Sequence, residues 1–344
     1  MTTLNTRQFP AQVPPKPSGS YAHIIMLRVT DSYPLFQTDG ELNTARVSAG
    51  SDGSSSSQII TRLTMFKRKQ TTPERLVGRE LLRRYGFISP ESVDGSSKVA
   101  EDANGLPFDE YNVAFCQWTP DAISYGYAIG DSGSERSKVL SDTCYSLTPY
   151  DDSHEAFTLN APYESGTMSQ RGAVTSRINE QDHIRPQVIF PSVLTTRDLT
   201  WPLFRYVLNN VLRTRRYGAQ TTRTGRVDNR IIGIVLADGE IFSNLKFTQR
   251  LYDVLADQGA INLPDPVDVS AATAAARALL PELVKEDGIV INQMLLGDDL
   301  AAFLQSLIQE SSDESSVKAL LQAAWNDSEG YHEAWLSKGK KGKK

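Results

Sequence analysis

A ten-residue segment near the start of the chain, Tyr21–Thr30 (YAHIIMLRVT), has the composition of a buried β-strand. Apolar and β-branched residues fill it, and these residue types favour strands. Ile231–Ala237 is a second such segment, and Asp238 and Gly239 close it as a turn. Both segments are far too short to cross a bilayer. They therefore predict a sheet inside a folded domain.

Helices are expected between these strands. Thr72 as a cap and Pro73 at the first helical position predict a helix that runs to about Tyr85. Leu199–Tyr217 has apolar residues on one side at the helical period, which predicts an amphipathic helix. Asn244–Ala256 follows a capping serine and is predicted to be a third helix.

Strands and helices that alternate, with long insertions between them, indicate an α+β sheet domain. A split βαβ arrangement of the ferredoxin or RNA-recognition type fits this order best. Residues 1–19 are expected to form a flexible arm before a core at 20–258, in which Ile123–Ile129 is predicted to be a strand. Residues 259–336 are expected to form an acidic helical region, followed by a basic tail at 337–344.

Charge is distributed unevenly over the 344 residues, whose net charge is -5. Residues 61–90 carry eight basic and two acidic side chains, and residues 197–230 carry the same numbers. Residues 251–344, in contrast, carry eight basic and fifteen acidic side chains. Two basic segments on a mildly acidic chain indicate a local site for a polyanion. Charge alone would more often indicate two solvated faces.

The loop at 217–226 strengthens the polyanion interpretation. It combines hydroxyls, amides and arginines, which suit phosphate and sugar contacts, and Tyr217 could stack on unpaired bases. The spacing does not distinguish RNA from DNA. The residues predicted to contact nucleic acid here and in the basic segments are Arg46, Lys67, Arg68, Lys69, Arg75, Arg79, Arg213, Arg215, Arg216, Tyr217, Gln220, Thr221, Thr222, Arg223 and Arg226.

Other chemistries have weaker support. The sequence contains no phosphate-binding glycine loop, dinucleotide motif or serine-nucleophile elbow. Cys116 and Cys144 could ligate a metal together with His154, but their spacing matches no zinc motif, so buried thiols and no zinc are expected. Asp39 and Glu41 follow the first strand, where they could hold Mg²⁺ or simply form a turn.

Five stretches, taken together and in order, resemble the backbone subunit of the type I-D CRISPR surveillance complex. They begin with HIIMLRVTDSYPLFQTDGELNTARV (23–47) and MFKRKQTTPERLVGRELLRRYG (65–86), and continue through 125–147, 160–193 and 212–245. That subunit belongs to the repeat-associated RNA-binding superfamily. The resemblance implies a hand-shaped, modified RNA-recognition core with large insertions, one at about 85–150 and a thumb-like hairpin at about 163–187.

The resemblance also implies a function. Copies would assemble along a guide CRISPR RNA that pairs with target DNA, or alternatively RNA. The thumb would interrupt this duplex with Met168 as a wedge and Arg171 and Arg177 as backbone contacts. Further implied partners are the large, small and 5′-handle-capping subunits and a recruited helicase–nuclease. The subunit would be cytosolic, bind no membrane and need no cofactor. Because type III relatives cut the target with an acidic residue, a Mg²⁺-dependent nuclease using Asp39 and Glu41 is the alternative.

Overall fold

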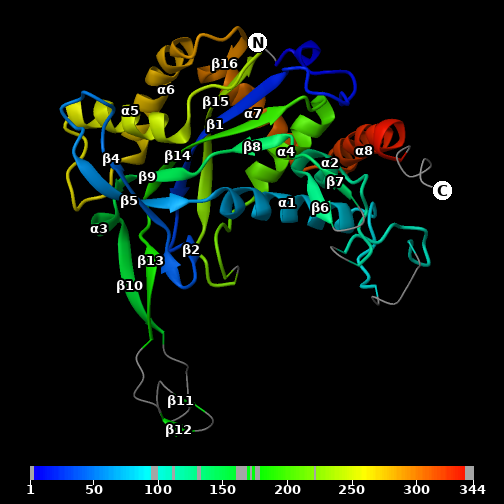
Figure 1. Cartoon of the computed structure of the whole chain (residues 1–344), viewed down its shortest axis with the longest axis horizontal. Helices are drawn as coiled ribbons and strands as arrows, with labels where there is room; N and C mark the ends of the chain where they lie inside the picture. The colour runs from blue at the N-terminus through cyan, green and yellow to red at the C-terminus, as the bar shows by residue number, and fades with distance from the viewer. Residues whose placement is uncertain are drawn as a thin grey trace.

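A five-stranded antiparallel sheet lies at the centre of the computed structural model, with the strand order β16-β15-β1-β14-β8 (Figure 1). The structure describes residues 4–93, 100–110, 113–129, 133–159, 169–170, 173–174, 179–220 and 222–337. The five strands are Tyr21–Thr30 (β1), Val139–Ser141 (β8), Ile189–Arg197 (β14), Val227–Ala237 (β15) and Ile291–Leu295 (β16).

The connections reproduce the predicted split βαβ arrangement. The chain runs from β1 through α1 (Lys67–Arg84) to β8, and then from β14 through α4 (Trp201–Arg213) to β15. In the sheet, β1 lies between β14 and β15, and β8 lies on the outer side of β14. A first strand between the third and fourth is the ferredoxin-like order. The prediction of an α+β core of this type with large insertions is therefore confirmed.

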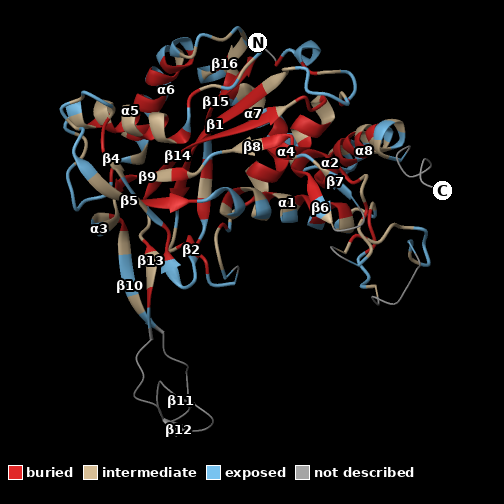
Figure 2. Cartoon of the chain, viewed as in Figure 1, coloured by how far each residue is buried: buried red, intermediate tan, exposed pale blue. Residues whose placement is uncertain are grey.

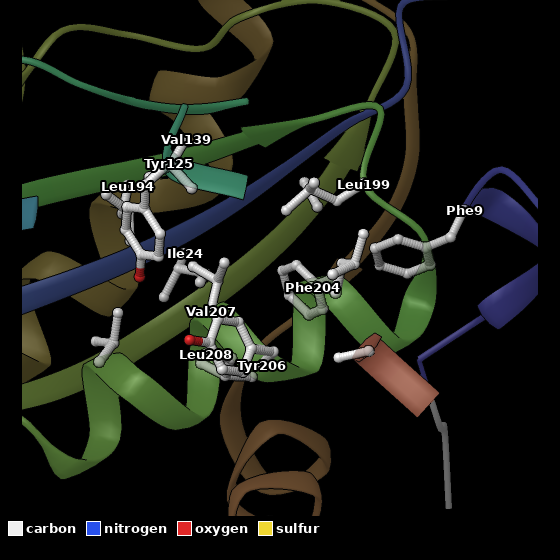
Figure 3. Packing of buried hydrophobic residues seen from close by; sticks show 14 of the residues in the cluster. Phe9, Ile24, Tyr125, Val139, Leu194, Leu199, Phe204, Tyr206, Val207 and Leu208 are labelled. Carbon is white, nitrogen blue, oxygen red and sulfur yellow. The ribbon is translucent and has the colours of Figure 1, made fainter. Parts of the chain in front are cut away.

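Helices cover both faces of the sheet. Alternate residues of a strand point to opposite faces, and so Ile24 of β1 packs with Phe204 of α4, whereas Ile25 packs on the other face with Phe247 of α5 (Asn244–Asp257). Figure 3 shows the first of these clusters, and Figure 2 shows β1, β14 and β15 buried between the two helical layers. The second face is covered by α5 together with α6 (Val269–Glu286).

The acidic C-terminal part of the chain is not separate from this core. Its strand β16 pairs with β15, and α6 packs on the sheet. Helices α7 (Gly297–Ser311) and α8 (Glu314–Tyr331), followed by a π-helical turn at His332–Leu336, complete it. Leu307 of α7 and Leu321 of α8 belong to the same buried hydrophobic cluster as Phe204 of α4. The predicted division at 258/259 is therefore wrong, because the sheet crosses it.

The predicted flexible arm is also wrong. Leu4, Phe9 and Val13 are buried, and the Phe9 ring lies 5.0 Å from that of Phe204 between centroids. A short 3₁₀ turn at Thr6–Gln8 precedes Phe9. The prolines and polar residues predicted disorder, but three well-spaced apolar side chains attach this segment to the core.

Two predicted element boundaries need correction. Helix α1 begins at Lys67, after the extended N-cap Phe66, and so Pro73 lies inside the helix and not at its first position. The segment predicted as a strand at 123–129 starts as helix α2 (Pro120–Tyr125), capped by the Thr119 side chain. Only Tyr127–Ile129 is a strand, β6, which pairs with β7 (Gly133–Glu135).

Smaller sheets extend from the end of the central sheet where β14 begins. One contains β4 (Thr44–Ser48), β5 (Ile59–Met65) and β9 (Cys144–Pro149), and helix α3 (Tyr150–Ser153) follows it. A second pairs β2 (Gln37–Thr38) with β3 (Glu41–Leu42). The projecting hairpin of Figure 1 pairs β10 (His154–Leu159) with β13 (Asn179–Ile184), and β11 (Ser169–Gln170) pairs with β12 (Ala173–Val174). None of the described helices is long and apolar enough to span a membrane.

Candidate nucleic-acid interface

The loop between α4 and β15 is held against the segment that follows β1. The Ala219 amide donates to the Leu35 carbonyl at 2.8 Å, and the Gly225 amide donates to the Tyr33 carbonyl at 3.0 Å. Gly218 has a φ of +96°, and a Cβ there would lie 2.2 Å from the Leu35 carbonyl oxygen. Only glycine fits both the backbone angle and this close approach.

Hydrogen bonds within the loop fix its shape. The Thr224 hydroxyl donates to the Tyr217 carbonyl at 2.7 Å and accepts from the Leu35 amide at 3.1 Å. The Arg216 guanidinium donates to the Thr224 carbonyl at 2.6 Å. The loop therefore presents the exposed Arg223 and Arg226 from a defined backbone.

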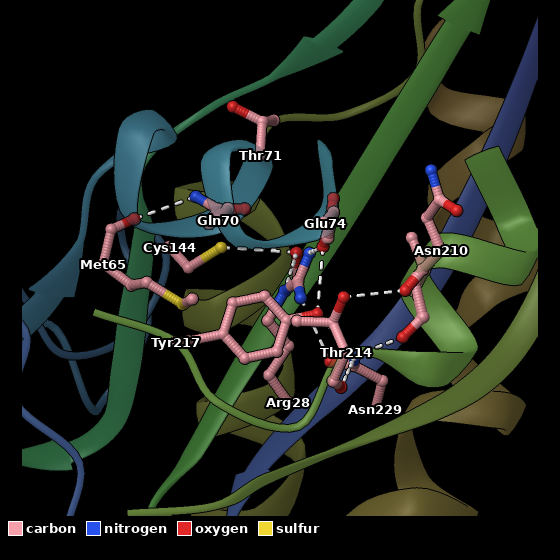
Figure 4. Close-up of polar contacts among 12 residues, drawn as sticks. Arg28, Met65, Gln70, Thr71, Glu74, Cys144, Asn210, Thr214, Tyr217 and Asn229 are labelled. Atoms are coloured by element: carbon pink, nitrogen blue, oxygen red, sulfur yellow. Dashed lines mark hydrogen bonds and ion pairs between the residues drawn. The ribbon is translucent and has the colours of Figure 1, made fainter. Parts of the chain in front are cut away.

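A buried polar network lies beneath the loop (Figure 4). Arg28 of β1 and Glu74 of α1 form a fully buried ion pair with an N–O distance of 2.9 Å. The Tyr217 hydroxyl donates to the same Glu74 oxygen at 3.1 Å and accepts from the Asn229 amide at 2.7 Å. Asn229 in turn accepts from Arg28 at 3.0 Å. Three regions far apart in sequence, at Arg28, at Glu74 and at residues 217–229, are thereby held together.

This network corrects the role predicted for Tyr217. Its side chain is fully buried, and its ring lies 4.9 Å from the Arg28 guanidinium carbon. Burial raises the pKa of the Tyr217 hydroxyl, which stays protonated and donates to Glu74. Tyr217 therefore positions the loop and cannot stack on a base.

The first turn of α1 lies beside this loop and carries three cations. Lys67 and Arg68 are exposed and Lys69 is partly so, and Phe66 supplies no side-chain cap. Cations in a first turn oppose the helix dipole, whereas the free amides there favour an anion. One buried cluster contains both Met65, two residues before the helix, and Tyr217, so the turn and the loop share an anchor.

Arg75 and Arg79, in contrast, point into the protein. Arg75 pairs with Asp121 at 2.8 Å, and Arg79 pairs with Asp109 at 2.9 Å and with Asp121 at 3.5 Å. Burial, with the nearby Asp121 carboxylate, raises the pKa of Asp109 to about 6. Arg79 is buried, and both arginines tie α1 to the insertion. Their predicted contact with nucleic acid is therefore wrong.

The remaining predicted residues lie at varied positions. The Arg213 guanidinium donates to the Asn209 side-chain oxygen and to the Ser311 carbonyl. A nitrogen of Arg215 lies 4.0 Å from an Asp228 carboxylate oxygen. Exposed positions that stay available to a ligand are Arg46 on β4 and Gln220 and Thr222 in the loop. Thr221 and the thumb residues Met168, Arg171 and Arg177 lie outside the described residues.

Sequence reasoning missed the residues that hold this surface in place. Arg28, Glu74, Thr224 and Asn229 are buried positioning residues. Their partners lie up to 201 positions away in the chain, as for Arg28 and Asn229. The only local signal was the presence of charged residues inside an apolar strand and on the inner side of a helix.

The residues of the alternative metal and thiol sites are Asp39 and Glu41 on one hand and Cys116 and Cys144 on the other. Asp39 and Glu41 are exposed on the β2–β3 turn, where Asp39 has a φ of +54°. Cys116 and Cys144 are free and buried, and burial raises the pKa of Cys144 to about 11. Within the described part of the chain, no group of three or more His, Cys, Asp and Glu side chains has the arrangement of a metal site. The two carboxylates of the turn thus do not form a complete ligand set by themselves.

Comparison with known proteins assigns the family. The family model described as "Csc2 Crispr" matches residues 8–321. The chain belongs to the Csc2 family. The crystal structure of Thermofilum pendens Csc2 is similar to this Csc2-family chain with a TM-score of 0.61 and 13% identity, over 98% of this chain and 95% of that one. At this identity the likeness shows a shared fold.

Two further chains of solved structures are similar over their lengths. One is described as "CRISPR RNA-guided surveillance complex", with a TM-score of 0.47, 10% identity and coverage of 89% of this chain and 98% of that one. The other is described as the same complex, "pre-nicking", with a TM-score of 0.48, 9% identity and coverage of 90% and 100%. No curated protein matches this Csc2-family chain.

Proposed function

We propose that this chain is a non-catalytic, cytosolic backbone subunit of a type I-D CRISPR surveillance complex that binds guide RNA. The observation that carries the proposal is the cationic surface formed by the first turn of α1 and the rigid α4–β15 loop, in a member of a CRISPR family. Copies would assemble along the guide and support its pairing with a target strand. The large, small and capping subunits and a helicase–nuclease would complete the assembly.

The chemistry of this surface suits binding that is independent of sequence. Arginine and lysine side chains and free helix amides recognise phosphates, which are the same in every guide. The guide itself would read the target by base pairing. Lys67, Arg68, Arg216, Arg223 and Arg226 could each contact one phosphate. Five such contacts on a single strand predict a slope of about -3.5 for log affinity against log salt.

The test is charge reversal on the first turn of α1. Lys67→Glu/Arg68→Glu should weaken guide binding at least tenfold at 0.15 M salt, because two phosphate contacts become repulsive. The matched control is Arg277→Glu/Lys285→Glu on α6, which makes the same charge change at two exposed positions on the opposite helical layer. Binding is measured on RNA that co-purifies with the complex. Equal affinity for the two variants would refute the surface assignment.

The nuclease alternative is tested separately. Asp39→Ala, in the purified complex with Mg²⁺ and a labelled complementary strand, should leave the target strand as intact as in the wild type. Cleavage by the wild type that is lost in this variant would assign a metal-dependent activity to the β2–β3 turn. Guide binding, measured on the same samples, shows whether the variant still assembles.

A further inference from the structure

A polar pocket with a volume of about 420 Å³ lies where β14 ends. Its walls come from the N-terminal segment 14–17, the β7–β8 connection, the end of β14 and Tyr331 of α8. β14 runs from Ile189, beside the projecting hairpin, to Arg197 at this pocket. Nine strand residues span about 25 Å, and so the pocket is distinct from the cationic surface of α1.

Four cations line the pocket: Lys16, Arg136, Lys138 and Arg197. Lys138 is almost buried and donates to Glu135 at 2.7 Å. Lys16, Arg136 and Arg197 form no ion pair with any residue that the structure describes. Three cations at the mouth of one pocket are therefore available to a ligand.

The carboxylates of the two acidic lining residues, Glu135 and Asp198, already accept hydrogen bonds from the protein. Asp198 accepts from the Ser18 hydroxyl at 2.6 Å, the Ser18 amide at 3.0 Å and the Ser20 amide at 3.0 Å. Glu135 accepts from Lys138 and, at 3.3 Å, from the Tyr331 hydroxyl. Asp198 also has a φ of +59°, which a non-glycine residue adopts only where its surroundings impose it. These hydrogen bonds fix the wall without any ligand. Neither carboxylate depends on Lys16, Arg136 or Arg197 for a partner.

We infer that this pocket binds a phosphomonoester. Four basic and two acidic side chains leave a net lining charge of +2, which matches the charge of about -2 on a phosphomonoester at neutral pH. A ligand with a single carboxylate would neutralise only half of the lining charge. The volume lies in the range of small-molecule sites, and arginine forks bind phosphate oxygens in pairs. The phosphate comes either from a mononucleotide or from the 5′ end of an oligonucleotide.

Calorimetric titration of the purified full-length chain tests this inference. The probes are adenosine monophosphate, adenosine, and one short oligonucleotide with and without a 5′-phosphate. At least one probe with a terminal phosphate should bind more tightly than its counterpart without that phosphate. Arg136→Gln/Arg197→Gln should weaken that binding at least tenfold, whereas Arg277→Gln/Lys285→Gln at two exposed positions of α6 should change it less than twofold. Lys67→Glu/Arg68→Glu on α1 is measured beside them to show whether the phosphate binds on α1 instead. Saturation by the mononucleotide assigns a small-molecule ligand, and saturation only by the 5′-phosphorylated oligonucleotide assigns a strand end.

Four results would overturn the inference. Three of them are binding of adenosine as tight as that of its monophosphate, phosphate-dependent binding that is unchanged in Arg136→Gln/Arg197→Gln, and no saturation by any phosphorylated probe at millimolar concentration. Loss of binding in the α1 variant would place the phosphate on the guide surface and would equally overturn it. Because the pocket and that surface are mutated separately, failure here leaves the guide-binding proposal standing, and failure there leaves this one standing.

Discussion

The buried pair between Arg28 and Glu74 gives the sharpest prediction about how the guide surface is held. Both side chains are fully buried, and their N–O distance is 2.9 Å. Glu74→Gln removes the negative charge and keeps the shape. Arg28 would then keep the Asn229 oxygen at 3.0 Å and the Tyr217 ring as partners, but no counter-charge.

The expected cost follows from this burial. Removing one partner of a buried ion pair leaves the other charge uncompensated, which costs about 3–5 kcal/mol. Gln retains one oxygen that can accept from Arg28 and Tyr217, and so we expect the lower end, about 3 kcal/mol. The entropy of unfolding grows with chain length, which gives about 1.4 °C per kcal/mol for 344 residues. The melting temperature should therefore fall by roughly 4 °C.

The control is the same substitution at an exposed pair. Glu314 and Lys318 on α8 are 2.8 Å apart, with side chains 67% and 52% exposed, so Glu314→Gln should leave the melting temperature unchanged. The double variant Glu74→Gln/Arg28→Met should cost about 2 kcal/mol less than the sum of its two singles. Thermal melting of the wild type and of all four variants (Glu74→Gln, Arg28→Met, the double variant and Glu314→Gln) measures both effects. If Glu74→Gln melts within 2 °C of the wild type, the pair does not hold α1 to the sheet.

Three further predictions concern pH, the loop and the N-terminal segment. Burial lowers the pKa of His23 to about 4, so its neutral ring stabilises the fold above pH 6.5 and this contribution is lost towards pH 4. The advantage of wild type over His23→Gln should shrink by about 2.5 kcal/mol from pH 7 to 4.5 in urea unfolding. The raised pKa of Asp109 makes stability change with pH in the opposite sense. Because Asp109 is present in both proteins, its contribution cancels in this comparison. Gly218→Ala should cost about 1–3 kcal/mol through strain against Leu35, seen in thermal melting and weaker guide binding. Phe9→Ala should cost about 3 kcal/mol, and a loss below 1 kcal/mol would restore the flexible-arm interpretation.

Elements with local signals were predictable from the sequence. The strand at Tyr21–Thr30 has the predicted bounds, because its residues fill both covered faces of a sheet. Helix α5 begins after the predicted cap Ser243, whose hydroxyl accepts from the Lys246 amide at 3.2 Å. The start of α1 was not predictable in the same way, because the capping signal at Thr72 and Pro73 competes with helical residues before it.

The basic composition of the proposed guide surface could be read from the sequence, but which of its arginines are exposed could not. Arg68 and Arg79 lie on the same basic segment, and nothing local distinguishes them. Arg79 is removed from the surface by Asp109 and Asp121, which lie 30 and 42 positions further along the chain. Whether an arginine faces solvent or an internal carboxylate depends on how the insertion packs, and sequence spacing does not encode that.

Both faces of the central sheet are covered by helices, and this bears on where we place the proposed guide surface. In an RNA-recognition domain, aromatic residues on an open sheet face stack on bases. Here α5 and α6 occupy the face opposite α1 and α4, and Ile25 and Leu27 of β1 are fully buried under them. The sheet face that an RNA-recognition domain would use is thus covered, and the proposed guide surface lies beyond the strand ends, where it presents cations and backbone amides rather than stacked rings. Such a surface can follow a phosphate chain of any sequence, and this is the property that a subunit bound to many different guides requires.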